Sequence, residues 1–174
     1  LVVQRRSPNY FESLCRSIIG QQVSVAAATT IFGRFVQQTG LDPVKVANLS
    51  EQQSKVIGLS RQKLGYLKDL ALHFVKDPAV YNHLEKLPDD EVIAELVEVR
   101  GIGTWTAQMF LMFTLQRPDV FAPDDVGLQR AMMNLYGWNE LPAKAELTEL
   151  ADAWIPYRTV ACLHLWQSLD NVPV

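Results

Sequence analysis

The stretch Leu96-Val97-Glu98-Val99-Arg100-Gly101-Ile102-Gly103-Thr104-Trp105-Thr106-Ala107 decides the fold of this 174-residue chain. An apolar helical pattern ends at the Gly-Ile-Gly triplet, and a second helical pattern begins at Thr104. Gly101 and Gly103 allow a positive φ and leave their backbone amides uncovered. Those amides precede a helix N-terminus, where unpaired N–H groups and the helix dipole attract anions. We therefore predict a hairpin between two helices that can bind a phosphate through its backbone, although an ordinary helix–helix connection has the same glycines.

Apolar residues recur at helical spacing along the rest of the chain, and no segment alternates convincingly at period two. The sequence therefore predicts an all-α protein of about nine helices, forming a single domain over residues 1–174 with two helical lobes around one central cleft. The expected helices include 51–57, 61–75, 89–97, 104–115, 126–136 and 157–169, together with one that Ser24 begins and Gly40 ends.

Composition excludes several classes of protein. No apolar run approaches the roughly 18 residues of a membrane span, and no signal peptide is visible. Cys15 and Cys162 lie in apolar helical patterns, as buried reduced thiols do, and they are too few for an iron–sulfur cluster, which needs about four thiolates. We therefore expect an intracellular protein, cytoplasmic in a prokaryote or nuclear in a eukaryote, without membrane contact or iron–sulfur cluster.

The net charge of −3 argues against nucleic-acid binding, but the charges are unevenly distributed. Residues 1–70 carry a net charge of +5 and residues 71–174 one of −8. The positive half could form one face of a cleft. Backbone amides at helix ends also reduce the number of basic side chains that such binding needs.

An acidic pair, Asp124 and Asp125, follows Pro123 and lies twenty residues after Trp105. From the local sequence, one acid caps the next helix and the other complements its dipole. A carboxylate beside helix amides is also favoured in its ionised form, in which it can stabilise a developing positive charge.

The hairpin and the acidic pair together resemble the helix-hairpin-helix DNA glycosylase superfamily. Within it, the chain is most similar to the 3-methyladenine DNA glycosylase II family, in a compact form without the N-terminal β-rich domain of some relatives. The family stretch Gly-Ile-Gly-x-Trp-Thr-Ala, followed by an apolar helix, matches residues 101–107 nearly residue for residue. The resemblance covers about residues 10–168 and implies a monomer that binds damaged double-stranded DNA.

The resemblance implies that Asp125 is the catalytic carboxylate, which stabilises an oxocarbenium-like sugar, orients a water, or does both. An N-alkylated purine is already cationic and leaves without protonation, so one aspartate and an aromatic pocket suffice. Trp105 stands where lyase relatives have a Lys, so no Schiff base is expected. The implied activity is flipping and hydrolytic excision of N-alkylated purines of the 3-methyladenine and 7-methylguanine type, leaving an abasic site.

Further site residues follow from the same match. The base pocket is expected to hold Trp105, Met109, Trp166 and Asp124, although both tryptophans also suit a core. The expected DNA contacts are Gly101, Ile102, Gly103 and Thr104 of the hairpin, the turn Gln21, Gln22, Val23 and Ser24, and Lys63. Gln22 stands where one branch has a bulky aliphatic wedge. The bland alternatives are a polar turn for residues 21–24 and an exposed turn for Lys63.

The resemblance also implies a structural Na⁺ or K⁺ on the main-chain carbonyls of Val97, Val99 and Gly101, while the chemistry itself needs no cofactor. Arg158 and His164 are interpreted as structural. Three other functions stay open: a glycosylase for deaminated, oxidised or ethenoadduct bases, a non-catalytic DNA-damage-binding module, and a helical protein-interaction domain.

Overall fold

The computed structural model describes residues 9–170, in which every regular element is a helix, as predicted. The ends of the expected 1–174 domain lie outside these residues. The chain divides into two compact units, and the boundary in the sequence lies between Phe110 and Leu111. None of the helices in residues 9–170 is long and apolar enough to cross a bilayer.

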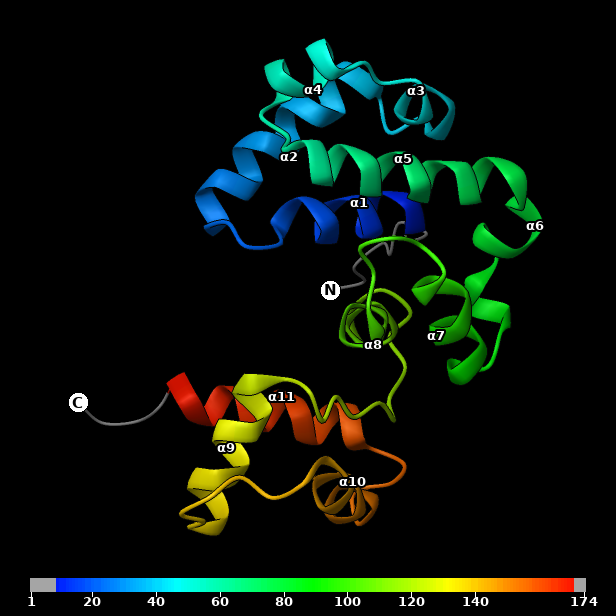
Figure 1. Cartoon of the computed structure of the whole chain (residues 1–174). Helices are drawn as coiled ribbons and strands as arrows, with labels where there is room; N and C mark the ends of the chain where they lie inside the picture. The colour runs from blue at the N-terminus through cyan, green and yellow to red at the C-terminus, as the bar shows by residue number, and fades with distance from the viewer. Residues whose placement is uncertain (1–8, 171–174) are drawn as a thin grey trace, which may run out of the picture. The chain divides into compact units, whose positions relative to one another are not determined.

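The first unit is built around a long helix, α5, which contacts α1 and α3 (Figure 1). Leu67 and Leu70 of α5 are fully buried, as are Leu14 and Ile18 of α1. The elements of this unit are α1 (Tyr10–Gly20), α2 (Val25–Thr39), α3 (Pro43–Ala47), α4 (Glu51–Ile57), α5 (Arg61–Lys76), α6 (Pro78–Tyr81), the 3₁₀ helix η1 (Leu84–Lys86), α7 (Asp89–Val97) and the start of α8 (Thr104–Phe113).

Helix ends in this unit follow the local signals in the sequence. The Ser24 side chain accepts from the Ala27 N–H at the start of α2, and Gly40 ends that helix with a left-handed φ of 61°. Ser50 forms the capping box of α4. These ends were predicted, because a cap depends only on residues within one turn.

The expected number of about nine helices was too low, because two Asp-Pro pairs each begin a short helix. Asp42 caps α3 and Asp77 caps α6, with Pro43 and Pro78 at the first helical position. Proline there lacks only an N–H that the helix does not use. Pro78 follows the end of α5 at Lys76 and also begins the next helix, α6.

The second unit contains the end of α8 and three further helices, α9 (Val126–Tyr136), α10 (Lys144–Asp152) and α11 (Arg158–Asp170). Helix α11 packs on α9, and the core between the elements includes Leu128, Met132 and Leu147. Both cysteines are fully buried, Cys15 in the first unit and Cys162 in the second. Burial raises the pKa of Cys162 to about 12, with the negative charge of Asp125 acting in the same direction.

Candidate functional site

The hairpin lies between α7 and α8, as predicted. Its turn is closed by hydrogen bonds from the Val99 N–H to the Leu96 carbonyl (3.2 Å) and from the Ile102 N–H to the Val99 carbonyl (3.1 Å). The Ile102 side chain is buried and anchors the loop, whereas Gly103 and Thr104 are exposed. The hairpin therefore presents the N-terminus of α8 to solvent.

The two hairpin glycines differ in a way that the sequence does not indicate. Gly101 has φ +89°, and a Cβ there would lie 2.2 Å from Cδ2 of Tyr66. Gly103 has no positive φ, and a Cβ there would meet nothing within 4 Å. The positive φ that glycine allows is therefore present at Gly101 and absent at Gly103, where the protein's own atoms would also leave room for a Cβ.

Two side chains of helix α5 contact the hairpin. The Arg100 N–H donates to the Asp69 carboxylate (2.9 Å), and the Tyr66 ring lies against Gly101. The Tyr66 hydroxyl accepts in turn from Nε2 of Gln62 (2.7 Å). Tyr66 and Asp69 stand three residues apart and therefore share one face of the helix.

The α1–α2 turn is held by two side chains that were expected to contact DNA. Lys63 Nζ donates to the carbonyls of Ile19 and Gln21, at 2.7 Å each. Burial lowers the pKa of this ammonium. Gln21 Nε2 donates to the Gly101 carbonyl (2.9 Å), which joins the turn to the hairpin. Both groups are thus occupied within the protein, and their contacts to DNA stay predictions.

The exposed part of the same turn carries an unusual backbone. Gln22 has φ +56°, a left-handed conformation that L-residues other than Asn and Asp rarely adopt. Gln22, Val23 and Ser24 are exposed, and Val25 behind them is 85% exposed. Val25 was not among the expected DNA contacts, which ended at Ser24. Its only signal in the sequence is that an apolar residue directly follows a helix cap.

The two acidic candidates have different surroundings. Asp125 is buried at 9% exposure, and its Oδ1 accepts from the Leu128 N–H (2.8 Å) as the N-cap of α9. Asp124 is exposed and forms an ion pair with Lys144. The capping interpretation is therefore confirmed for Asp125, while Asp124, an expected base-pocket residue, has its carboxylate on a surface lysine.

The Trp166 side chain forms a hydrogen bond with the Asp125 carboxylate. Its Nε1–H donates to Oδ1 of Asp125 (2.9 Å), which thus receives two N–H donors. Gly127 makes this approach possible, because a Cβ there would lie 3.0 Å from Asp125 Oδ1 and 3.1 Å from Trp166 Cδ1. The ring of Phe113, which is 56% exposed, lies 5.9 Å from the Trp166 ring between centroids. Sequence analysis missed Gly127 and expected Trp166 in the base pocket, with no indication of its bond to Asp125.

The start of α11 is fixed to the segment that leads into the acidic pair. Arg158 donates to both carboxylate oxygens of Asp119, from Nε (2.8 Å) and Nη2 (3.0 Å). The Thr159 hydroxyl accepts from the Val120 N–H and donates to the Arg117 carbonyl. These Arg158 hydrogen bonds hold the pKa of the Asp119 carboxyl below its usual value. The structural interpretation of Arg158 is confirmed, and α11 is positioned to bring Trp166 to Asp125.

The remaining expected pocket residues lie on α8. Trp105 is 44% exposed, so the interpretation as a core tryptophan is wrong. Met109, one turn further along the helix, is half-buried. Both side chains therefore present surface that a ligand can reach.

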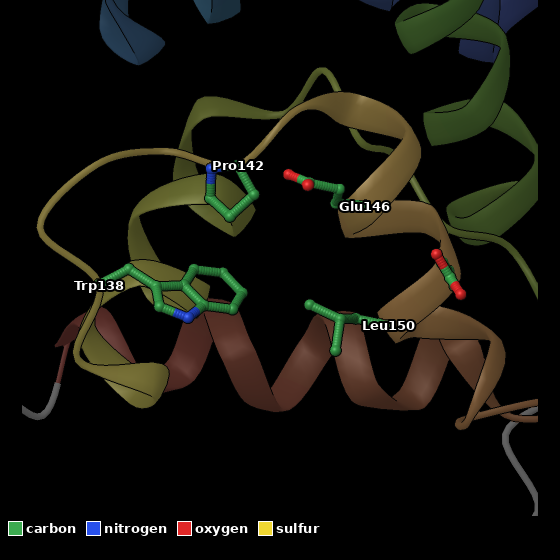
Figure 2. Close-up of a pocket in the computed structure, with 5 residues that line it drawn as sticks. Trp138, Pro142, Glu146 and Leu150 are labelled. Carbon is green, nitrogen blue, oxygen red and sulfur yellow. The ribbon is translucent and has the colours of Figure 1, made fainter.

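A second feature of the α9–α11 unit is a hollow of about 390 Å³ at the start of α10. Figure 2 shows Trp138 and Pro142 on one side of it and Glu146 and Leu150 on the other. Glu149 completes the lining. The two carboxylates repel phosphate, which makes this hollow a poor candidate for a DNA contact.

Residues 9–170 hold no cluster of three His, Cys, Asp or Glu side chains that could bind a metal. Main-chain carbonyls suit a monovalent cation by their chemistry. The Val99 carbonyl accepts from Ile102 and the Gly101 carbonyl from Gln21, and each oxygen has a second lone pair that a cation could use.

Comparisons with known proteins identify relatives of the chain. It is 39% identical over 141 residues to DNA-3-methyladenine glycosylase of Saccharomyces cerevisiae, covering 70% of this chain and 45% of that protein. Its structure is similar to the crystal structure of a DNA-3-methyladenine glycosidase from Bacillus halodurans (TM-score 0.83, 40% identity, 92% of this chain and 76% of that one). It is also similar to Schizosaccharomyces pombe 3-methyladenine DNA glycosylase in complex with abasic DNA (TM-score 0.77, 28% identity, 91% and 79%).

The family follows from the extent of the match. The chain spans 59% of the length of a Bacillus subtilis relative to which it is 30% identical. The sequence profile described as "HhH-GPD superfamily base excision DNA repair protein" matches residues 15–157, most of the chain. The chain therefore belongs to the HhH-GPD superfamily of base excision DNA repair proteins.

Proposed function

We propose that this protein is a monofunctional DNA glycosylase that flips N-alkylated purines out of duplex DNA and hydrolyses their N-glycosidic bond, leaving an abasic site. The observation that carries the proposal is the environment of Asp125, a buried carboxylate whose Oδ1 receives N–H donors from Leu128 and Trp166. Relatives named DNA-3-methyladenine glycosylases support the choice of alkylated purines as substrates.

Asp125 would act on the sugar. As a purine leaves, positive charge develops at the sugar C1′, and a fixed carboxylate lowers the energy of that charge. The two donors fix the carboxylate before substrate binds, so little reorganisation is needed during the reaction. An N-alkylated purine carries its own positive charge and leaves as a neutral base, which explains how one carboxylate suffices without a general acid.

Water is the proposed nucleophile. Trp105 cannot form a Schiff base, and its exposed indole offers a π face to a cationic purine instead. The product strand is therefore expected to stay intact, and no covalent protein–DNA adduct should form. The protein would act inside the cell, as a monomer, and without a cofactor.

Binding to DNA would use the hairpin backbone. The exposed amides at the start of α8 suit a phosphate, which carries no base information and so serves all sequences equally. A Na⁺ or K⁺ on the carbonyls of Val97, Val99 and Gly101 would add positive charge beside that phosphate.

The test compares Asp125→Asn with Asp124→Asn in single-turnover excision from duplexes that each contain one lesion. Asp125→Asn should lower excision at least ~10²-fold, the scale of a positioned catalytic carboxylate, and keep binding to abasic-site DNA. Asp124→Asn should retain near-normal excision, because its partner is an exposed lysine. A reversed result would mean that Asp124 is the catalytic acid.

The same assay defines the substrate and the reaction class. A panel that includes deaminated, oxidised and ethenoadduct bases should show release mainly of 3-methyladenine and 7-methylguanine. Borohydride should trap no adduct. Binding without release of any base would identify a non-catalytic module, and absence of binding at low salt would point to a protein-interaction domain.

A further inference from the structure

Two segments that are distant in sequence, the α1–α2 turn and the hairpin, meet at one face of α5. Lys63 reaches the end of α1, Tyr66 lies under Gly101, and Asp69 holds the Arg100 N–H. The three side chains recur every three residues, so one face of one helix carries both the α1–α2 turn and the hairpin. Gln21 completes the arrangement, because it belongs to the turn and donates to the hairpin carbonyl of Gly101.

The position of Lys63 favours a role inside the protein. Its ammonium lies on the Ile19 and Gln21 carbonyls, at the C-terminal end of α1, where unpaired carbonyls and the helix dipole attract a cation. Two of its three N–H donors are thereby used. The side chain is half-buried, unlike that of Arg61 in the same turn of α5, which is 86% exposed.

The turn that Lys63 holds is under backbone strain. Gln22 keeps a left-handed φ of +56° without being glycine, and such a conformation persists only where its surroundings enforce it. The residue before it provides that enforcement, since the Gln21 carbonyl is bound by Lys63 and the Gln21 side chain by the hairpin. Strained, exposed residues of this kind are concentrated at sites that contact ligands.

We infer that Lys63 and Gln21 are positioning residues, which fix the exposed turn at Gln22 relative to the hairpin so that both contact the same DNA in one register. Lys63 acts through the turn, not on a phosphate. The consequence for DNA rests on the proposed function. The coupling of turn and hairpin is a property of the protein alone and can be measured without DNA.

The first experiment measures amide hydrogen exchange in the free protein. Lys63→Met keeps the apolar stem and removes the donors, and Gln21→Leu removes only the link to Gly101. Lys63→Met should speed exchange about tenfold or more in residues 19–21 and also at the hydrogen-bonded hairpin amides of Val99, Arg100 and Ile102, because local opening of the turn releases the hairpin. Gln21→Leu should speed exchange at the same three hairpin amides. The control Arg61→Met should change neither segment, and Lys63→Arg, which retains donors, should restore most of the protection.

The second experiment separates positioning from phosphate contact. A cation on a phosphate adds about 0.9 to the slope of log K against log salt, so its loss is visible in that slope. Lys63→Met should leave the slope for undamaged duplex unchanged, while extrusion of a fluorescent base analogue from bound DNA falls about tenfold or more. Gln21→Leu should reduce extrusion in the same way.

Two results would overturn the inference. Exchange that rises only in residues 19–21 in both variants would show that turn and hairpin are independent. A slope that falls by about one in Lys63→Met, with extrusion unchanged, would make Lys63 a phosphate contact. If the parent protein binds no DNA, the proposed function fails, and the exchange experiment still decides whether Lys63 and Gln21 couple the two segments.

Discussion

At the scale of single residues, the geometry around Asp125 depends on a missing side chain. Gly127 lies in the first turn of α9, and an added Cβ would stand 3.0 Å from Asp125 Oδ1 and 3.2 Å from Nε1 of Trp166. A contact that short displaces either the carboxylate or the indole. The glycine therefore supports the Trp166–Asp125 hydrogen bond, while it weakens the helix in which it sits.

We predict that Gly127→Ala lowers excision about tenfold without lowering stability. Alanine favours a helix over glycine by up to ~1 kcal/mol, which offsets the displacement of Trp166. Single-turnover excision and the urea midpoint, measured together, test both parts. Trp166→Phe, which keeps a ring and removes the N–H, serves as the matched comparison and should lose a similar factor. Normal excision by Gly127→Ala would show that the close approach has no role in the reaction.

At the scale of elements, α5 connects the parts of the first unit that are expected to meet DNA. Leu67 and Leu70 of α5 are buried in the core of this unit, and α5 contacts α1. The Lys63, Tyr66 and Asp69 side chains of α5 reach the turn and the hairpin. The conformation of the hairpin therefore depends on its contacts with α5 as well as on its own glycines.

The two hairpin glycines should respond differently to the same change. Gly101→Ala places a Cβ against the Tyr66 ring at a φ of +89°, so we expect a loss of about 2 kcal/mol in unfolding free energy and weaker binding to every duplex. Gly103→Ala meets no protein atom within 4 Å, and its effect on unfolding should stay within about 0.5 kcal/mol. Urea unfolding of both variants checks the difference. If both variants lose the same small amount of unfolding free energy, the Tyr66 ring moves away from the new Cβ with little energetic cost.

At the scale of the whole molecule, charge is divided unevenly between the two units. Residues 1–110 hold twelve Lys or Arg and eleven Asp or Glu, whereas residues 111–174 hold four and eight. Neither unit has the excess of cations that is typical of proteins that bind DNA through lysines and arginines. The proposed binding to DNA would then depend on backbone amides and on a few cations.

Salt dependence of DNA binding measures this balance. Amides bind phosphates without neutralising them, so few counterions are released, and the slope of log K against log salt should be shallower than about −4. Fluorescence anisotropy with undamaged duplex at several salt concentrations provides the slope. A slope near −8 would indicate that lysines and arginines carry most of the phosphate contacts.

Much of the fold was predictable from the sequence because it depends on neighbours within one or two turns. The bounds of α7 and α9 were predicted as the structure has them, and the caps at Ser24 and Ser50 follow from residues three positions away. The hairpin was predicted for the same reason, as was a helix cap within the acidic pair, and the structure shows that Asp125 is the residue that caps. The Asp-Pro pairs that begin α3 and α6 carried a local signal that the sequence analysis did not use.

Tertiary structure alone decided which distant groups meet. Gln21 and Gly101 are 80 residues apart, Lys63 and Ile19 are 44 apart, and Trp166 and Asp125 are 41 apart. Local propensity has no information about these pairs, because each depends on how whole helices pack. The same packing determines that Gly101 has no room for a Cβ while Gly103 does, and it places the Lys63 ammonium on carbonyl oxygens of α1. The type of a side chain determines which hydrogen bonds it can form. Which partner lies within hydrogen-bond distance depends on how the helices pack.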